Sequence, residues 1–179
     1  FPIEILEAAR AVWPKLKPIS CRISATDWVA DGGLTGADAV EVAKMLFAHG
    51  ADIIDVSSGQ TSPDADPVYG RMFQTHLSEQ VRLEARVPTI AVGNITIADQ
   101  VNTIVAAGRA DLVALARPHL TEPHFTLKAA AHYGYTLQNW PDQYLAGKAQ
   151  AERQAEQEKF RLQELLLANK PQSHKNSIK

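Results

Sequence analysis

Four short apolar segments of the chain each lead into a cluster of polar residues or glycine. The clusters cover residues 22–27, 57–59, 93–94 and 117–118. Loops that follow parallel strands converge at one edge of a sheet, so the four clusters are expected to meet there. Arginine side chains and glycine amides both suit the binding of a phosphate. The spacing therefore predicts a site for an anionic ligand, built from several loops.

Arg22 lies inside a segment that is otherwise mostly apolar. A guanidinium removed from water needs acceptors or a counter-anion to offset its lost hydration. The sequence leaves two partners open: an anionic group of a ligand, or a carboxylate of the same sheet such as Asp55. We take Arg22 as a candidate ligand-binding residue and keep the pair with Asp55 as the alternative.

Gly93, Asn94 and Arg117 are the candidates for phosphate binding. Gly93 has no side chain, so its own amide and that of Asn94 can approach a phosphate closely. Arg117 directly precedes a predicted helix and can donate two charge-assisted hydrogen bonds to one phosphate. The alternatives are an ordinary turn glycine and an arginine that forms a cap or salt bridge at the rim of the sheet.

A second group of residues could line a pocket beside this site. It contains the end of the second strand and the loop after Arg22: Ser57, Ser58, Gly59, Asp27 and Trp28. Serine and glycine at a strand end also form turns, and Trp28 could equally pack within its loop. The six histidines form no HxxxH or Cys/His cluster, and His119 and His124 suit a helix start or the surface, so we expect no metal site.

Apolar periodicity predicts strands that alternate with helices. The strands are expected at Ile19–Ser24, Asp52–Val56, Thr89–Val92 and Asp111–Leu115. The helices are expected at about Pro2–Val12, Gly36–His49, Met72–Arg86, between Thr96 and Gly108, and at Pro123–Tyr133, with Thr35, Thr96 and Thr121 as N-caps. This alternation is typical of βαβ units and a parallel sheet, and four such strands are half of a (β/α)8 barrel.

The length and composition agree with half a barrel in a small-molecule-binding protein. The chain has 179 residues, whereas a closed (β/α)8 barrel typically needs about 250. The net charge of −2 gives no bias toward nucleic acid or anionic membranes, and Cys21 is the single cysteine. We expect a cytoplasmic protein whose upstream half is absent from this fragment. Beyond Gly147, residues 148–179 are expected to form a charged surface helix and a disordered tail from Lys170 to Lys179.

Together and in this order, the four segments resemble the C-terminal half of the old yellow enzyme family of FMN-dependent oxidoreductases. The resemblance covers residues 1–147 and is similar to bacterial ene-reductases and to the reductase portion of salicylyl-CoA and 2-aminobenzoyl-CoA hydroxylases. It is carried by Arg22-Ile23-Ser24-Ala25, by Asp55-Val56-Ser57-Ser58-Gly59, and by the segments around Gly93 and Arg117. It implies a (β/α)8 TIM barrel that binds FMN and takes hydride from NADH or NADPH.

The resemblance also implies roles for single residues. Arg22 would approach the N1/C2-carbonyl edge of the flavin, where negative charge accumulates on reduction. The FMN phosphate would lie against Gly93, Asn94, Ala116 and Arg117. The residues 108–111, Gly-Arg-Ala-Asp, help to identify the family but stand at a strand start, so Arg109 and Asp111 are expected to be structural.

Two positions depart from the family pattern. Ala116 stands where many members have glycine, and Ala146 stands where bacterial members often have an arginine that reaches the neighbouring subunit. The substrate-binding pair and the proton-donating tyrosine of the family belong to the first half of the barrel, so the catalytic residues are unknown here. The implied full-length protein is a homo-oligomer that acts on a small-molecule substrate.

Three functions remain open from the sequence. The first is an FMN oxidoreductase that passes hydride to an electron-poor C=C bond or an aromatic-CoA-derived substrate, inactive without the first half. The second is another phosphate-binding TIM-barrel flavoenzyme. The third is a non-catalytic half-barrel assembly module, which burial of Leu162, Leu165 and Leu166 against a partner would favour.

Overall fold

The structure is a computed structural model that describes residues 1–168. The chain divides into two compact units, Phe1–Thr121 and the segment that begins at Glu122. The predicted disordered tail, Lys170–Lys179, lies outside the described residues. The predicted boundary near Gly147 stays a prediction.

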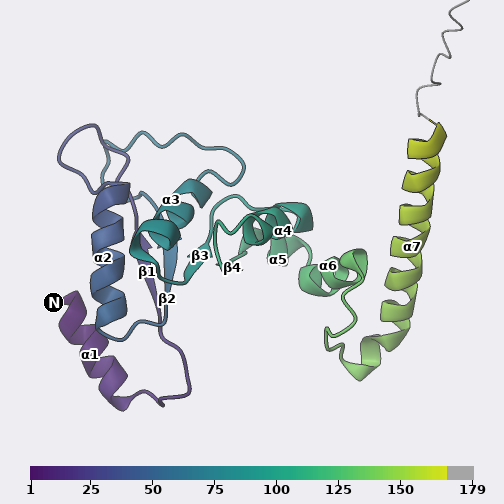
Figure 1. The fold of residues 1–179 in the computed structure, drawn as a ribbon, viewed down its shortest axis with the longest axis horizontal. Coiled ribbons are helices and arrows are strands. Elements are labelled where there is room, and N and C mark those ends of the chain that lie inside the picture. The colour runs from purple at the N-terminus through teal and green to yellow at the C-terminus, as the bar shows by residue number, and fades with distance from the viewer. Residues whose placement is uncertain (169–179) are drawn as a thin grey trace, which may run out of the picture. The chain divides into compact units, whose positions relative to one another are not determined.

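The first unit is built on a four-stranded parallel sheet (Figure 1). The strands are β1 (Ser20–Ser24), β2 (Ile53–Ser57), β3 (Thr89–Ala91) and β4 (Leu112–Val113), paired in the order β1-β2-β3-β4. The helices between and around them are α1 (Pro2–Val12), α2 (Gly36–Ala48), α3 (Thr75–Gln80), the π-helical turn η1 (Val81–Ala85), α4 (Ala98–Ala106) and α5 (Arg117–Thr121). The predicted alternation of parallel strands and helices is confirmed.

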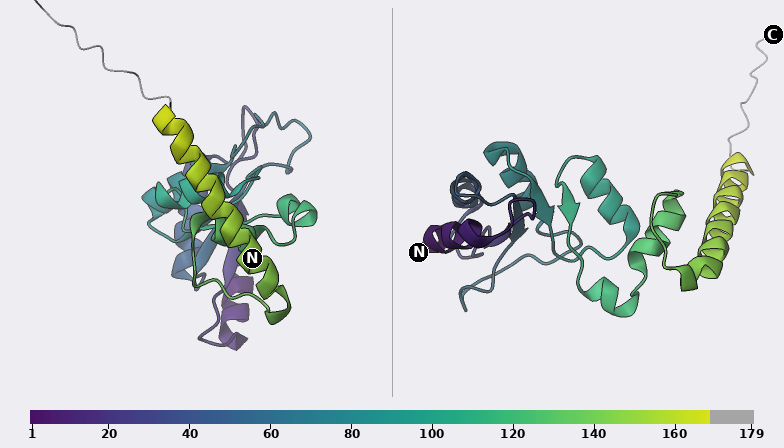
Figure 2. Two further views of the ribbon diagram at one scale, coloured as in Figure 1. Left: turned by 90° about the vertical axis from the view of Figure 1, so that its right-hand side faces the viewer. Right: turned by 90° about the horizontal axis from the view of Figure 1, so that it is seen from below.

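The helices α2, α3 and α4 follow one another along one face of the sheet (Figure 2). Apolar residues of β2 and of the helices fill the space between, and Ile54, Val56 and Val81 are fully buried there. Successive side chains of a strand point to opposite faces, so Arg22 in β1 and its register partner Asp55 in β2 share a face. Side chains that point toward the helices pack in the core, whereas those on the opposite face remain available to contact a ligand.

Helix α2 begins as the sequence predicts. The Thr35 hydroxyl accepts a hydrogen bond from the Asp38 amide, and the Asp38 carboxylate accepts one from the Thr35 amide at 2.9 Å, which completes a capping box. The helix ends at Ala48 with His49 as its C-cap, and Gly50 follows with a φ of 107°. A positive φ of this kind favours glycine, which supports the predicted C-terminal glycine.

Three other helix boundaries differ from the prediction. Ile97 is the N-cap of α4 and has no side chain that could cap it. The Thr96 hydroxyl caps no helix amide, because both it and the Thr96 amide donate to the Gln100 side-chain oxygen, at 3.4 and 2.8 Å. Thr121 ends the short helix α5, in which Pro118 occupies an early position that suits proline. The helix expected over residues 72–86 is divided, since Met72 has a φ of 57° and residues 81–85 form a π-helical turn.

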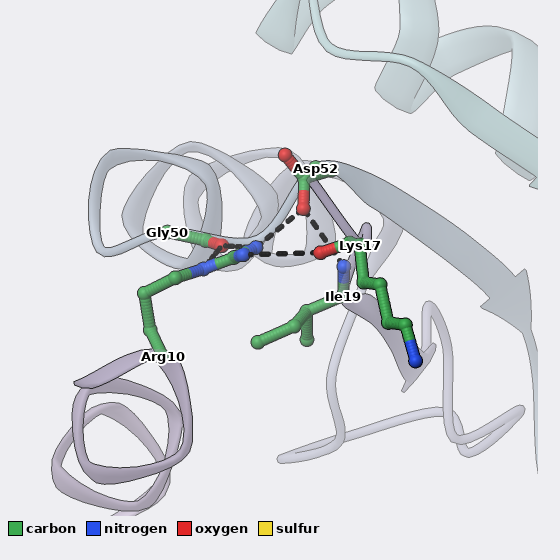
Figure 3. Close-up of polar contacts among 5 residues, drawn as sticks. All are labelled: Arg10, Lys17, Ile19, Gly50 and Asp52. Atoms are coloured by element: carbon green, nitrogen blue, oxygen red, sulfur yellow. Dashed lines mark hydrogen bonds and ion pairs between the residues drawn. The ribbon is translucent and has the colours of Figure 1, made fainter. Parts of the chain in front are cut away.

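An arginine and an aspartate fasten the amino ends of β1 and β2 (Figure 3). Arg10 of α1 donates to the Gly50 carbonyl at 2.9 Å through Nε and also to the Asp52 carboxylate. The same carboxylate accepts the Ile19 amide at 2.7 Å. We call this arrangement of arginine, glycine carbonyl, aspartate and neighbouring-strand amide an amino-end clamp.

A second amino-end clamp fastens β3 and β4 in the same way. Arg82 of η1 donates to the Gly108 carbonyl at 3.0 Å and to both oxygens of Asp111 at 3.0 and 2.9 Å. Asp111 also accepts the Thr89 amide at 2.9 Å. Next to it, Arg109 pairs with Glu79 at 2.8 Å. Arg109 and Asp111 therefore form structural contacts, as expected for the start of a strand.

The second unit contains two α-helices in its described part. They are α6 (Phe125–Tyr133) and α7 (Leu145–Ala168), with the 3₁₀ turn η2 (Asp142–Tyr144) before α7. The ring of His124, the N-cap of α6, lies 5.0 Å from that of Tyr144. Helix α7 confirms the predicted C-terminal surface helix, and its leucines at 162, 165 and 166 are exposed.

Candidate functional site

A cavity of about 450 Å³ opens at the carboxyl ends of the strands. It is lined from all four strands or the loops that follow them, and seven of the ten predicted site residues belong to its wall: Arg22, Ser57, Ser58, Gly59, Gly93, Asn94 and Arg117. The structure therefore brings together residues that lie up to 95 positions apart in the chain, from Arg22 to Arg117.

A neighbouring cavity of about 350 Å³ lies between the loops that follow β3 and β4. Its wall contains Gly93, Asn94, Ala116 and Arg117, the four residues expected around a phosphate. Gly93, Asn94 and Arg117 also line the cavity of about 450 Å³, which we call the larger cavity of this pair, so the two hollows share one border.

The turn at Gly93 and Asn94 has an unusual backbone with open donors. The φ angles are 111° at Gly93 and 49° at Asn94. In the part of the chain that the structure describes, the amides of Gly93, Asn94 and Ala116 donate to no acceptor. A β-carbon at Gly93 would stand 2.1 Å from Nε2 of Gln74. Glycine is therefore required both by the turn and by its neighbour, and the free amides can accept an anion.

Arg117 begins α5 with an exposed side chain. Within residues 1–168 its guanidinium has no hydrogen bond or ion pair. The alternative of a rim salt bridge is therefore not formed. An arginine beside three open amides has the donor set that a phosphate group requires, so these residues fit that group.

Arg22 forms the pair with Asp55 that the sequence left open. Its Nε and Nη2 donate to one oxygen of Asp55 at 2.9 and 2.7 Å. The Asp55 side chain is 12% exposed, whereas that of Arg22 is 59% exposed. Asp55 thus anchors one edge of the guanidinium, and Arg22 still faces the larger cavity.

Gln74 is a site residue that the sequence analysis missed. It is 5% exposed, precedes α3 as its N-cap and lines the larger cavity. Ser58 donates a short hydrogen bond to its Oε1, and its Nε2 donates to the Val92 carbonyl at 3.0 Å. A lone glutamine within a predicted helix carries no pattern that points to such a role.

Trp28 packs within its loop. Its indole N–H donates to the Ser58 hydroxyl at 2.8 Å, and its ring lies 6.4 Å from those of Phe73 and His76. It does not line the larger cavity but abuts Gly59, where a β-carbon would stand 3.0 Å from the indole. The packed-loop alternative therefore describes Trp28, which supports the cavity wall from outside.

Asp27 lies apart from the two cavities described above. It lines a separate hollow of about 460 Å³ with residues of the loops 29–33 and 61–64. Its carboxylate accepts from the Thr61 hydroxyl and from the Leu34 amide, and these two hydrogen bonds lower the pKa of Asp27. Asp27 therefore fastens two loops to each other.

Within residues 1–168, no group of three or more His, Cys, Asp or Glu side chains is placed to hold a metal ion. None of the helices there combines the length and apolar character needed to cross a membrane.

The fold and cavities define an α/β half-barrel with a hollow at the carboxyl ends of its strands whose wall can bind an anion. The family model of NADH:flavin oxidoreductases and NADH oxidases, which bind FMN, matches residues 1–135. The chain belongs to this family, and the predicted membership of the old yellow enzyme family, with its TIM-barrel fold, is confirmed.

Individual relatives agree with this assignment. The chain is 43% identical to an NADPH dehydrogenase of Clostridium acetobutylicum over 127 residues, which are 71% of this chain and 37% of the relative. It is 43% identical to an NADPH dehydrogenase of a Geobacillus species over 134 residues, 75% of this chain and 38% of the relative. The chain therefore spans about two fifths of the length of these relatives.

A likeness to a solved structure is weaker. A monotopic membrane protein, (S)-mandelate dehydrogenase, aligns with 93% of this chain and 34% of its own chain, at a TM-score of 0.46 and 15% identity. No inference rests on this likeness.

Proposed function

We propose that this chain supplies the phosphate-binding side of an FMN-dependent NAD(P)H oxidoreductase. The observation that carries the proposal is the meeting of three amides, those of Gly93, Asn94 and Ala116, with the guanidinium of Arg117, none of which has a partner among residues 1–168. Such donors bind a phosphate dianion through several charge-assisted hydrogen bonds in a fixed geometry.

FMN held at this site would supply hydride transfer from NADH or NADPH to an electron-poor C=C bond or an aromatic-CoA-derived substrate. In this proposal Arg22 provides a positive charge on the wall of the larger cavity, held in place by Asp55. Ser57, Ser58 and Gly59 form the neighbouring wall. In this proposal the groups that bind the substrate and donate the proton come from residues outside this chain, so we expect this chain alone to lack activity. We propose that the working enzyme is a cytoplasmic homo-oligomer.

The proposal is tested by titrating the chain with FMN and with riboflavin, which differs by lacking the phosphate. We expect FMN to bind more tightly, and Arg117→Ala to lower the ratio of the two affinities by about tenfold or more. The matched control is Arg109→Ala, because Arg109 pairs with Glu79 at the amino ends of the strands. Equal affinity for FMN and riboflavin in the unaltered chain would contradict the proposal.

A second measurement separates this enzyme from another phosphate-binding flavoenzyme. Arg22→Lys keeps the positive charge but loses the two hydrogen bonds to one oxygen of Asp55. We expect the reduction potential of flavin bound to this variant to fall, because its cation is held less firmly beside the ring. An unchanged potential would favour a flavoenzyme in which Arg22 does not approach the flavin.

A further inference from the structure

Three side chains form a relay of hydrogen bonds at the edge of the larger cavity. The Trp28 indole donates to Ser58 at 2.8 Å, Ser58 donates to Gln74, and Gln74 donates to the Val92 carbonyl at 3.0 Å. Trp28 lies in the loop after β1, Ser58 and Gln74 lie in the connection between β2 and α3, and Val92 directly follows β3. The relay therefore connects three of the segments that surround the cavity.

Both polar atoms of the Gln74 side chain form hydrogen bonds. Its oxygen accepts from Ser58, and its nitrogen donates to Val92, while the side chain is 5% exposed. The nitrogen also occupies the place that a β-carbon at Gly93 would need. The backbone at residues 92–93 therefore rests directly on the Gln74 side chain.

The contact of Gln74 with the Val92 carbonyl also fixes the direction of the Gly93 amide, because both groups belong to one peptide. A trans peptide is planar, and its C=O and N–H point in opposite directions. No peptide bond in the described part of the chain is cis. Because Gln74 holds the Val92 carbonyl, it also directs the Gly93 amide away from itself, and that amide has no acceptor within residues 1–168.

We propose that Gln74, held by Ser58 and Trp28, is a positioning residue that directs the Gly93 amide toward the flavin phosphate. This inference rests on the proposed function, because it assigns the phosphate to the Gly93 turn. Gln74 acts on the binding of the phosphate and not on the reaction. Because it holds the Gly93 amide in its binding orientation, this donor does not need to reorganise when the anion binds.

The test compares affinities for FMN and riboflavin in the variants Gln74→Leu and Trp28→Phe. Gln74→Leu removes both hydrogen bonds at similar volume, and Trp28→Phe removes only the indole donor. Gln80→Leu is the matched control, because Gln80 lies on the same helix, is half-buried and lines neither cavity at the Gly93 turn. Circular dichroism establishes that each variant is folded.

The ratio of FMN to riboflavin affinity is expected to fall about tenfold in Gln74→Leu and about threefold in Trp28→Phe. It should not change in Gln80→Leu. A general loss of structure would lower both affinities and leave their ratio, which separates positioning from folding. If Gln74→Leu does not fold, the ratio of affinities measured for Trp28→Phe tests the inference.

An unchanged ratio in the folded Gln74 and Trp28 variants, with a preference for FMN in the unaltered chain, would overturn this inference and leave the proposed function standing. No preference for FMN in the unaltered chain would overturn both.

Discussion

The two ends of the sheet use similar residues to opposite effect. At the amino ends, Arg10 and Arg82 each bind a glycine carbonyl and an aspartate, and each aspartate binds the amide of a neighbouring strand. At the carboxyl ends, Arg117 has no polar partner and the Gly93 and Asn94 amides have no acceptor within the described residues. The charged side chains of the amino-end clamps are thus paired with one another, whereas the carboxyl ends retain donors.

This difference separates structural polar groups from binding groups. A polar network in which each donor meets an acceptor stabilises the fold and has little left to offer a ligand. The repeat of the amino-end clamp, around Gly50-Ala51-Asp52 and again around Gly108-Arg109-Ala110-Asp111, supports this interpretation. The predictions below test whether stability and binding can be changed separately.

The largest effect is expected for Gly93→Ala, compared with Gly108→Ala. Both glycines have a positive φ, but an added β-carbon is 2.1 Å from Gln74 at Gly93 and no closer than 3.7 Å to Arg82 at Gly108. We expect unfolding free energy to fall by about 3 kcal/mol for Gly93→Ala and about 1 kcal/mol for Gly108→Ala. Chemical denaturation measures both, and equal losses would remove the argument for close packing at Gly93.

The next effect concerns the amino-end clamps. Asp111→Asn keeps the shape of the side chain but removes the charge that Arg82 and Thr89 share. We expect a loss of about 2 kcal/mol in unfolding free energy, and about 1 kcal/mol for Asp52→Asn, whose side chain is 51% exposed. The ratio of FMN to riboflavin affinity should not change in either variant. A fall in that ratio would show that the two ends are coupled.

Acid should weaken the amino-end clamps. The hydrogen bond from Arg82 lowers the pKa of Asp111, and the hydrogen bond from the Ile19 amide, followed by that from Arg10, lowers the pKa of Asp52. A carboxyl whose pKa is lower in the folded state stabilises the fold above its unfolded pKa, about 4, and loses this contribution as the pH falls through the folded value.

Melting temperatures measured from pH 7 down to about pH 3 test this prediction. The melting temperature should decrease once the pH is lower than about 4. The decrease should be smaller in Asp111→Asn, which lacks the carboxyl of Asp111. The same fall in both proteins would mean that other carboxyls govern acid stability.

The smallest effect is expected for an ion pair outside any network. Lys44 and Glu41 lie 2.7 Å apart on α2, with side chains 46% and 67% exposed. Solvent screens such a pair, so Lys44→Ala should change the unfolding free energy by less than about 0.5 kcal/mol. A loss as large as that of Asp52→Asn would show that network closure is not what distinguishes the clamps.

Much of the fold could be predicted because apolar periodicity records which faces are buried. The strands, the helix α2 with its Thr35 cap, and the group Gly93, Asn94 and Arg117 were all predicted from local pattern. The boundaries at Thr96 and Thr121 were predicted wrongly, because the Thr96 hydroxyl donates to Gln100 instead of capping α4, and Thr121 ends the short helix α5, which the apolar pattern did not predict.

The hydrogen-bond networks could not be predicted from the sequence for a different reason. The relay of Trp28, Ser58 and Gln74 joins residues that are up to 46 positions apart, and no periodicity relates them. The pair of Arg22 with Asp55 remained one of two options, because strand register determines it. Sequence pattern thus predicted the elements, whereas three-dimensional contact determines how their side chains combine.

The most direct test measures binding and stability in the same two variants. Arg117→Ala and Asp111→Asn are each titrated with FMN and riboflavin and each unfolded thermally. The division of the sheet predicts that Arg117→Ala loses the preference for FMN and keeps its melting temperature, while Asp111→Asn keeps the preference and melts at a lower temperature. Loss of both properties in both variants, or of neither in Arg117→Ala, would contradict it.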